Sequence, residues 1–395
     1  MKVLKIAGLI ILSFILFISL TIFGLAFSLN QTILNPDFVT SEINRLEIAP
    51  LAEALVAQQL PEELPEDLIS VFLDTITRLE PRLKEETNTV IYSVYDYLLG
   101  KRESPELASV LRSTFLSSDF IIAVIDEIDI APLVSIAFEE MPAEKLPIPE
   151  EAVAQVATGL VEVLSDQEPW IKEQIRNVVD PVADYLVGES ESFSVTISIQ
   201  PLIDNLKDMM REVFLEFPPP PLEGLSPDLI EEEFEEFWAE AGLPAIIEID
   251  ETIFGQEMPS PVGAFVADAE IGLGQAREYV GHFQLWYILI IVFMAVLIAG
   301  IVLIHRQVKG STRTLGIVFL ASGLVMLVGG LIGKNIAGEQ IVQAMHAAPA
   351  QLQVWILQFL VNLLAPLQSL SIGFIVGGTA LVVVSFVYKS RHATD

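Results

Sequence analysis

The chain has 395 residues, with 53 acidic and 21 basic side chains, a formal net charge of −32 and no cysteine. The acidic excess excludes the usual electrostatic route to nucleic acid, and the lack of cysteine excludes disulfides, thiolate zinc sites and a cysteine nucleophile. Hydrophobic residues make up 52% of the chain, so its acidic and apolar characters must lie in separate segments.

Four segments are apolar and long enough to cross a lipid bilayer, for which about 20 residues suffice. They are residues 6–28, 285–304, 315–332 and 369–388. The first apolar run is longer than that of a cleaved signal peptide, which favours a signal anchor over residues 1–28; cleavage is the alternative. Residues 285–395 are then a three-helix membrane domain.

Basic residues near the ends of the spans predict their orientation. Three clusters fall on one side of the membrane if there are four spans, namely Lys2 and Lys5; Arg306, Lys309 and Arg313; and Lys389 and Arg391. Only Lys334 falls on the other side. We therefore expect a plasma-membrane protein with both termini cytoplasmic and residues 29–284 extracytoplasmic.

Residues 351–365 are strongly apolar, yet short for a span, and Pro366 follows them. Gln351, Gln358 and Asn362 recur at helical spacing, which predicts an interfacial helix lying on the outer leaflet. A fifth span is the alternative, and it would place the basic C-terminus outside.

The predicted spans have no charged residue in their interiors, which argues against an autonomous pump or proton-coupled transporter. Gly329 and Gly333, and likewise Gly373 and Gly377, have the small-xxx-small spacing of close helix packing.

The outer region holds 51 of the 53 acidic and 13 of the 21 basic side chains, so residues 29–284 carry a charge of −38 (13 basic against 51 acidic). This acidity fits a solvated surface more simply than a specific site.

The outer region also repeats itself in sequence. The matching stretches are Asp37-Phe38 and Asp119-Phe120, Ile48–Leu51 and Ile130–Leu133 (separation 82), and Glu80-Pro81 and Glu168-Pro169, Asp96–Gly100 and Asp184–Gly188 (separation 88). The offset changes within residues 61–65 and 142–149. We therefore expect two duplicated helical repeats, residues 29–110 and 111–192.

Each repeat has the apolar periodicity of amphipathic helices. Pro81 and Pro169 either kink a long helix or begin its second half, and Gly100 and Gly188 are expected to end helices. Asp96 and Asp184 are expected to be structural rather than metal ligands.

Residues 193–284 are predicted to form a membrane-proximal α+β region. Alternation over residues 193–199 indicates a strand, with a second strand near 245–250. Helices are expected near 201–214 and 227–241, and a loop-rich approach to the membrane over 255–274.

No catalytic, cofactor-binding or metal-binding residue is predicted. The acidic cluster Glu231–Glu236 alternates with aromatic residues and fits the wet side of a surface helix, and it lacks a calcium-loop pattern. The four histidines, at positions 282, 305, 346 and 392, are dispersed.

The order of one span, a large outer domain and three spans resembles the layout of the FtsX and MacB type of permease subunit. That family passes force between an ATPase and an outer domain; the resemblance covers topology only, and the nine residues His305–Arg313 leave little room for a coupling helix.

The sequence thus predicts a mainly α membrane protein with four transmembrane helices and a large, duplicated helical extracytoplasmic domain containing a small β element. We expect a non-enzymatic prokaryotic membrane protein that is embedded in the lipid bilayer and acts as a scaffold for a protein or cell-envelope partner. The alternatives are an accessory subunit of a transport or signalling complex and a lipid-binding outer domain; homo-oligomerisation stays open.

Overall fold

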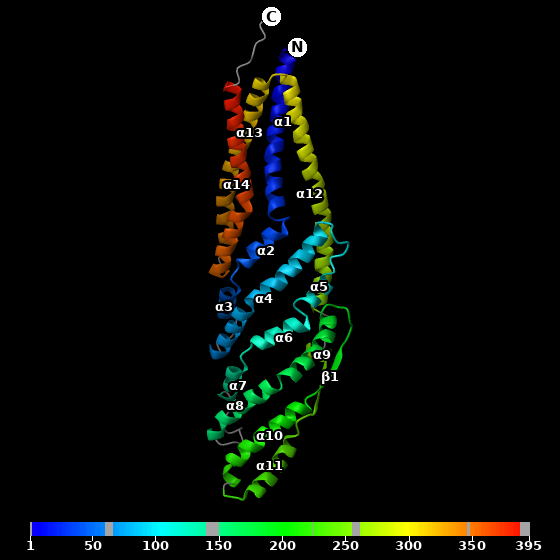
Figure 1. Ribbon diagram of the computed structural model, residues 1–395, viewed down its shortest axis with the longest axis vertical. Coiled ribbons are helices and arrows are strands. Elements are labelled where there is room, and N and C mark those ends of the chain that lie inside the picture. Colours follow the sequence, from blue (N-terminus) through cyan, green and yellow to red (C-terminus); the bar gives the residue numbers. More distant parts are fainter. Residues whose placement is uncertain are drawn as a thin grey trace. The chain divides into compact units, whose positions relative to one another are not determined.

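The computed structural model describes residues 2–59, 66–139, 150–222, 224–254, 261–345 and 348–387. The chain divides into two compact units. Unit 1 comprises Met1–Glu47, Ile91–Pro105 and Gly272–Asp395, and unit 2 comprises Ile48–Val90 and Glu106–Ile271. The described residues are mostly helical (Figure 1).

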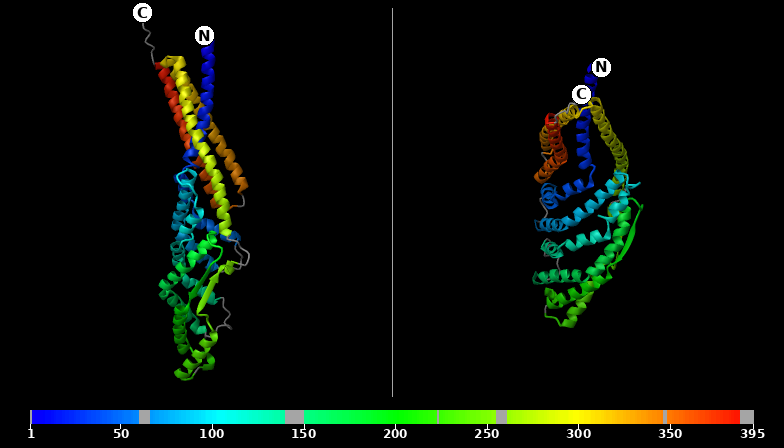
Figure 2. Two further views of the ribbon diagram at one scale, coloured as in Figure 1. Left: turned by 90° about the vertical axis from the view of Figure 1, so that its right-hand side faces the viewer. Right: turned by 45° about the horizontal axis from the view of Figure 1, so that its top comes forward.

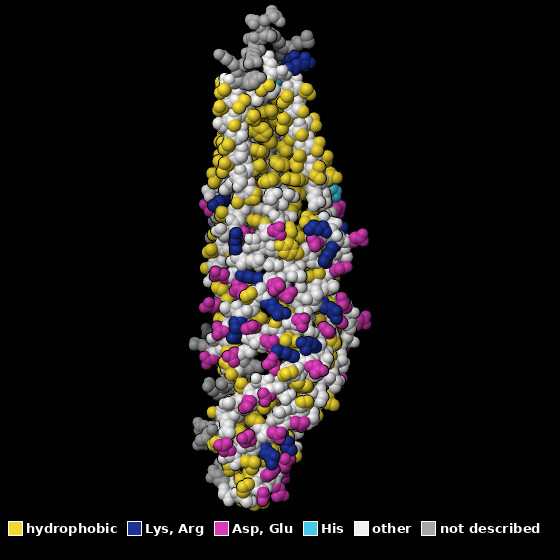
Figure 3. Space-filling view, in the orientation of Figure 1, with side chains coloured by type: hydrophobic (Ala, Val, Ile, Leu, Met, Phe, Trp, Pro, Cys, Tyr) yellow, Lys and Arg dark blue, Asp and Glu magenta, His cyan; other side chains and the backbone are white. Residues whose placement is uncertain are grey.

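Four helices are long and apolar enough to cross a membrane. They are α1 (Lys2–Gln31), α12 (Pro261–His305), α13 (Val308–Ala344) and α14 (Ala350–Val387). Hydrophobic side chains cover the surface of these helices, whereas acidic and basic side chains gather over the other elements (Figure 3). Two shorter helices, α5 (Leu107–Ser113) and α6 (Ser118–Glu127), pass the same test only when taken together across a 41° bend.

The long helices pack around a core that includes Leu16 and Leu20 of α1, Leu297 and Ile301 of α12, and Val318 of α13. Helices α13 and α14 lie side by side in each view (Figures 1 and 2). Their connection to α12 is tight, because only Arg306 and Gln307 separate α12 from α13.

Glycine spacing predicted the wrong contacts in this bundle. A Cβ on Gly316 would lie 2.8 Å from the carbonyl oxygen of Gly378, and one on Gly323 would lie 2.7 Å from that of Ser371. In contrast, a Cβ added to any of the four expected glycines would meet no described atom within 4 Å; these are Gly329, Gly333, Gly373 and Gly377. The close approach therefore uses small residues seven apart, which stay on one face of both helices.

The interfacial helix expected over residues 351–365 is the first part of α14, which continues through Pro366. Both halves pack on α13: a Cβ on Gly338 would lie 3.7 Å from Leu357, and one on Gly330 would lie 3.6 Å from Leu367. This packing on either side of the proline keeps the helix continuous despite the missing N–H group. The loop expected over 255–274 is also corrected, because α12 begins at Pro261.

The remaining described elements are α2 (Pro36–Asn44), α3 (Ile48–Gln59), α4 (Glu66–Leu98), α7 (Ile130–Glu139), α8 (Glu150–Asp166), α9 (Glu168–Leu186), β1 (Ser194–Ser198), α10 (Gln200–Glu216), η2 (Pro220–Leu222), α11 (Pro227–Ala241), β2 (Ile246–Asp250) and η3 (Glu251–Phe254). The two strands that the sequence predicts, β1 and β2, pair antiparallel with Ser194 opposite Asp250.

Unit 2 is built from layers of helices. Helix α8 packs between α7 and α10, α10 packs on α11, and α6 packs on α9. Small cores join these layers: Ala152 and Val156 of α8 meet Val213 of α10, and Phe214 of α10 meets Phe234 of α11. Sequential stacking of this kind is typical of helical repeat proteins.

The two sequence repeats share local hydrogen bonds at their N-terminal ends. The N–H groups of Leu34 and Leu116 donate to the carbonyls of Leu29 and Leu111, each at 3.0 Å. The buried hydroxyls of Thr32 and Thr114 both donate to the carbonyl four residues earlier, at 2.7 and 2.8 Å. Side chains of Asn35 and Ser117 then cap α2 and α6.

The C-terminal ends correspond as well. Glycines 100 and 188 have φ of +76° and +81°, the left-handed conformation that ends many helices. The carbonyl of Asp96 accepts from the N–H groups of Lys101 and Arg102, and that of Asp184 accepts from Glu189 and Ser190, at 2.8 and 3.1 Å in both cases.

Candidate functional site

Three adjoining cavities of unit 2 form what we call the layer groove. Their volumes are about 300, 650 and 590 Å³. Arg78 and Asp129 line both the first and the second cavity, and Ala131, Val161 and Ser165 line both the second and the third. The groove thus follows the layers α4, α6–α7 and α8–α9.

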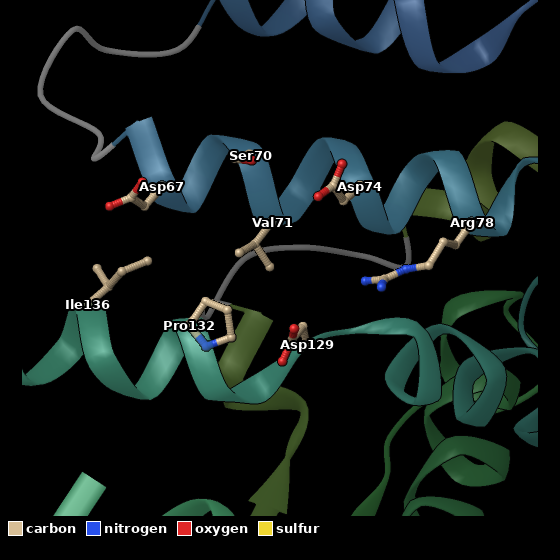
Figure 4. Close-up of a pocket in the computed structure, with 8 residues that line it drawn as sticks. All are labelled: Asp67, Ser70, Val71, Asp74, Arg78, Asp129, Pro132 and Ile136. Atoms are coloured by element: carbon tan, nitrogen blue, oxygen red, sulfur yellow. The ribbon is translucent and has the colours of Figure 1, made fainter. Parts of the chain in front are cut away.

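The first cavity lies between α4 and α7 (Figure 4). Asp67, Val71, Asp74 and Arg78 reach it from α4 because their spacing of three to four residues keeps them on one helix face. Across the gap stand Asp129, Pro132 and Ile136, at the start and on the first turns of α7.

Acidic side chains dominate the rim of the layer groove. The described lining residues include eight acidic side chains and only two basic ones. The acids are Asp67, Asp74, Asp126, Glu127, Asp129, Glu162, Asp166 and Glu168. The cations are Arg78 and Lys172. A rim of this composition favours a positively charged ligand.

Both cations are already held by acids of unit 2. Arg78 donates to the carbonyl of Glu127 at 2.6 Å and lies 3.4 Å from its carboxylate. Lys172 lies 2.5 Å from Glu168 and 3.1 Å from Asp126. Hydrogen bonds to Glu168 and then to Asp126 raise the pKa of Lys172 above its ordinary value. These cations therefore connect neighbouring layers. None of the ion pairs of the described residues includes the remaining acids of the groove, which are Asp67, Asp74, Asp129, Glu162 and Asp166.

The walls between the charged residues are apolar. They include Val71, Ile125, Ile128, Pro132, Ile136, Ala154, Ala157, Val161, Leu164 and Ile171. Within the described part of the chain, no three His, Asp or Glu side chains are arranged to hold a metal ion. The acidic rim and the apolar walls of the groove together suit a ligand with an apolar face and positive charges.

A second cluster, in unit 1, surrounds Glu42 of α2, which is only 2% exposed. Asn362 of α14 donates through Nδ2 to both carboxylate oxygens, at 3.1 and 3.0 Å, and Arg45 forms an ion pair with the same carboxylate. The indole N–H of Trp355 donates to the carbonyl of Glu42 at 2.8 Å, and Phe38 meets Phe359 at 5.9 Å between ring centroids. We call these residues the Glu42 cluster.

Sequence reasoning missed the Glu42 cluster. Asn362 was expected on the solvent-exposed face of an interfacial helix. Instead, its side-chain amide donates to the buried carboxylate of Glu42 in α2. The available signal was a carboxylate placed between the apolar residues of a short helix, which becomes informative only once its partner helix is known.

The other face of α2 meets the end of α4 within unit 1. The hydroxyl of Tyr92 donates to Asp37 at 2.8 Å, and that of Tyr95 donates to the carbonyl of Ile33 at 2.5 Å. Burial raises the pKa of the Tyr95 phenol. Helix α2 is thus bonded to both α14 and α4.

Each of the acids singled out by sequence has its own local partner. Asp96 pairs with Lys101 at 2.9 Å, and Asp184 pairs with Arg112 at 2.5 Å, each beside a helix end. On α11, Glu231 and Glu235 pair with Arg211 and Lys207 of α10, while Phe234 between them is fully buried.

The two described histidines have different partners. His282 contacts the carbonyl of Glu278, and His305 contacts Thr314 at 2.9 Å. Residues 346 and 392 lie outside the described residues, as do the segments 61–65 and 142–149 within which the repeat offset changes.

Comparison of the chain with protein-family models, with curated proteins and with solved structures found no match.

Proposed function

We propose that the chain is a non-enzymatic integral membrane protein of a prokaryotic cell surface, with residues 29–284 outside the plasma membrane. Four apolar helices and the basic residues at their shared ends support this topology. Residues 1–28 act as an uncleaved anchor, and both termini lie in the cytoplasm.

The outer domain is a tandem duplication that presents helices in layers. The hydrogen bonds shared at separations of 82 and 88 residues support this origin. Layered helical repeats commonly bind other proteins along the surface that the layers create.

The layer groove is the binding surface of this domain, and its partner is a basic amphipathic helix of another protein. The observation that carries the proposal is the acidic rim around apolar walls in adjoining cavities. An amphipathic helix places apolar anchors in such a groove while its lysines and arginines face the rim.

A force-transmitting subunit of a transport or signalling complex is the second candidate. The Glu42 cluster favours it, because α2 bonds one of the long apolar helices, α14, to the end of α4 in the outer region. The two-residue connection between α12 and α13 leaves no coupling helix there for an ATPase, which is why the scaffold is preferred.

Peptide binding to the full-length protein in lipid nanodiscs tests the groove. The probe is a helical peptide of about 18 residues with leucine on one face and lysine on the other; its counterpart replaces lysine with glutamate. We expect the lysine peptide alone to bind, and the double variant Asp74→Lys, Asp129→Lys to raise its Kd about tenfold, a change of about 1.4 kcal/mol.

The matched control reverses two exposed acids of α11, Glu232→Lys and Glu233→Lys, and is expected to change the Kd less than twofold. Equal weakening in both variants would show non-specific attraction to the acidic surface. Apolar lipid retained in the groove, or robust catalytic turnover by the protein, would replace the proposal with a lipid carrier or an enzyme.

A further inference from the structure

A separate cavity lies between α13 and α14 in unit 1, and we call it the hairpin groove. Its volume is about 620 Å³. Lys334, Asn335, Gly338, Glu339 and Gln343 line it from α13, and Leu357, Leu360 and Val361 line it from α14. It therefore combines one cation, one carboxylate and amide groups with an apolar wall.

The hairpin groove begins where the apolar part of α13 ends. Helix α13 has 37 residues and is about 56 Å long, whereas the hydrocarbon of a bilayer is about 30 Å thick. About 20 residues counted from Arg313 at its basic end reach Gly333, so Lys334 falls at the boundary between hydrocarbon and headgroups.

Contacts with neighbouring helices place the boundary at the same depth. Gly330 of α13 and Gly24 of α1 both lie close to Leu367 of α14. Phe23, next to Gly24, stacks on Tyr287 of α12 at 5.8 Å between ring centroids. Trp286, beside that tyrosine, is 67% exposed. Exposed tryptophan and tyrosine are enriched at this depth of a membrane.

Lys334 is partly buried, and none of the ion pairs of the described residues includes it. A lysine at headgroup depth attracts phosphate, and Glu339, about 7.5 Å further along the helix axis, attracts a cation. The two charges match the two ends of a zwitterionic headgroup.

We propose that the hairpin groove binds one phospholipid whose headgroup carries a phosphate and a primary amine. Lys334 binds the phosphate, Glu339 accepts hydrogen bonds from the ammonium group, and one acyl chain lies against Leu357, Leu360 and Val361. This site is independent of the layer groove and of its protein partner.

Lipid binding to the full-length protein, measured by native mass spectrometry, tests the site. The probes are phosphatidylethanolamine, phosphatidylcholine and phosphatidylglycerol with identical acyl chains. We expect one phosphatidylethanolamine to bind about fivefold more tightly than either other lipid, because only its headgroup offers both a phosphate and N–H donors.

Glu339→Gln should reduce this preference to less than twofold, because it removes the acceptor of the ammonium group. Lys334→Gln should weaken the binding of all three lipids, since each of them offers a phosphate, and Gly338→Leu should fill the groove and likewise weaken the binding of all three. Lys309→Gln, at the other end of α13, is the matched control and should retain the preference. A preference for phosphatidylglycerol, equal binding of the three lipids, a preference that survives Glu339→Gln, or unchanged binding of the lipids by Lys334→Gln would overturn the proposal.

Discussion

The two sequence repeats have the same local hydrogen bonds, yet their equivalent prolines have different effects. Pro81 lies inside the continuous helix α4, whereas Pro169 opens α9 after a break at Gln167. On the two turns before Pro81, Thr75 and Leu79 are buried. The corresponding positions before Pro169 are Val163, which is buried, and Gln167, which is only half-buried, so water can satisfy the backbone groups of a break at Gln167. The residue two positions before the proline, buried Leu79 or half-buried Gln167, thus distinguishes the continuous from the interrupted helix.

The repeats also differ in what their short helices bind. Glu42 of α2 is bonded to Asn362 and Trp355, whereas the equivalent residue of α6 is Val124. Conversely, Arg45, the residue after α2, corresponds to Glu127 of α6, which pairs with Arg78. The same local hydrogen bonds of the backbone thus occur with two different sets of side-chain partners.

The largest expected effect on stability comes from replacing each of the two prolines with alanine. Pro81→Ala should raise the free energy of unfolding by roughly 2–3 kcal/mol, because alanine restores an N–H group inside a helix. Pro169→Ala should change it by less than about 0.5 kcal/mol, since the first N–H groups of a helix have no partner in that helix. Thermal unfolding of the full-length protein in detergent, with hydrogen exchange of α4 and α9, measures both. Equal shifts for the two variants would contradict the comparison.

A smaller effect on stability is expected when Glu42 of the first repeat is replaced with valine, the residue at the corresponding position of the second repeat. Glu42→Val should destabilise the protein by roughly 2 kcal/mol, because Asn362 loses its acceptor in a buried site. Adding Asn362→Leu should recover at least half of the loss, since removing both partners leaves no unsatisfied polar group. A double variant whose loss equals the sum of the single losses would show that the pair is not coupled.

The smallest effect concerns Glu80, whose side chain accepts from the N–H group of Ala49 at 3.4 Å and pairs with Lys84 at 2.6 Å. Burial alone would raise the pKa of Glu80, but hydrogen bonds from Lys84 and from the backbone of α3 outweigh it and lower the pKa below 4.5. A lowered pKa means that the stabilisation is present above pH 4.5 and is lost as the pH falls through the folded-state value.

Glu80→Gln should therefore weaken the start of α3 by roughly 1 kcal/mol at neutral pH and remove its acid sensitivity below pH 4.5. Hydrogen exchange of Ile48 and Ala49 between pH 7 and pH 3.5, corrected for the intrinsic pH dependence of exchange, checks this. Glu168→Gln is the matched change in the second repeat; it should leave α7 unaltered, because Ala131 donates to Asp129 instead. Acid sensitivity that persists in Glu80→Gln would assign it to another carboxylate.

Much of the fold was predictable because its signals are local. Apolar length predicted the four long helices, and alternation over residues 193–199 predicted strand β1. Glycines 100 and 188 ended helices as expected, since a left-handed residue there needs no distant partner. The candidate sites were not predictable, because the layer groove and the Glu42 cluster join segments far apart in the chain.

The sequence by itself determined the helical periodicity, the helix caps and the separation of an apolar from an acidic region. These depend on side chains within one turn or on composition along one segment. Tertiary structure decided the rest: that α14 runs through Pro366, that Gly316 and Gly378 rather than Gly329 and Gly373 meet a neighbouring helix, and that Glu42 is buried. The physical reason is that close packing and the pairing of a buried charge each require two surfaces that fit each other. A single segment of the sequence specifies only one of the two surfaces.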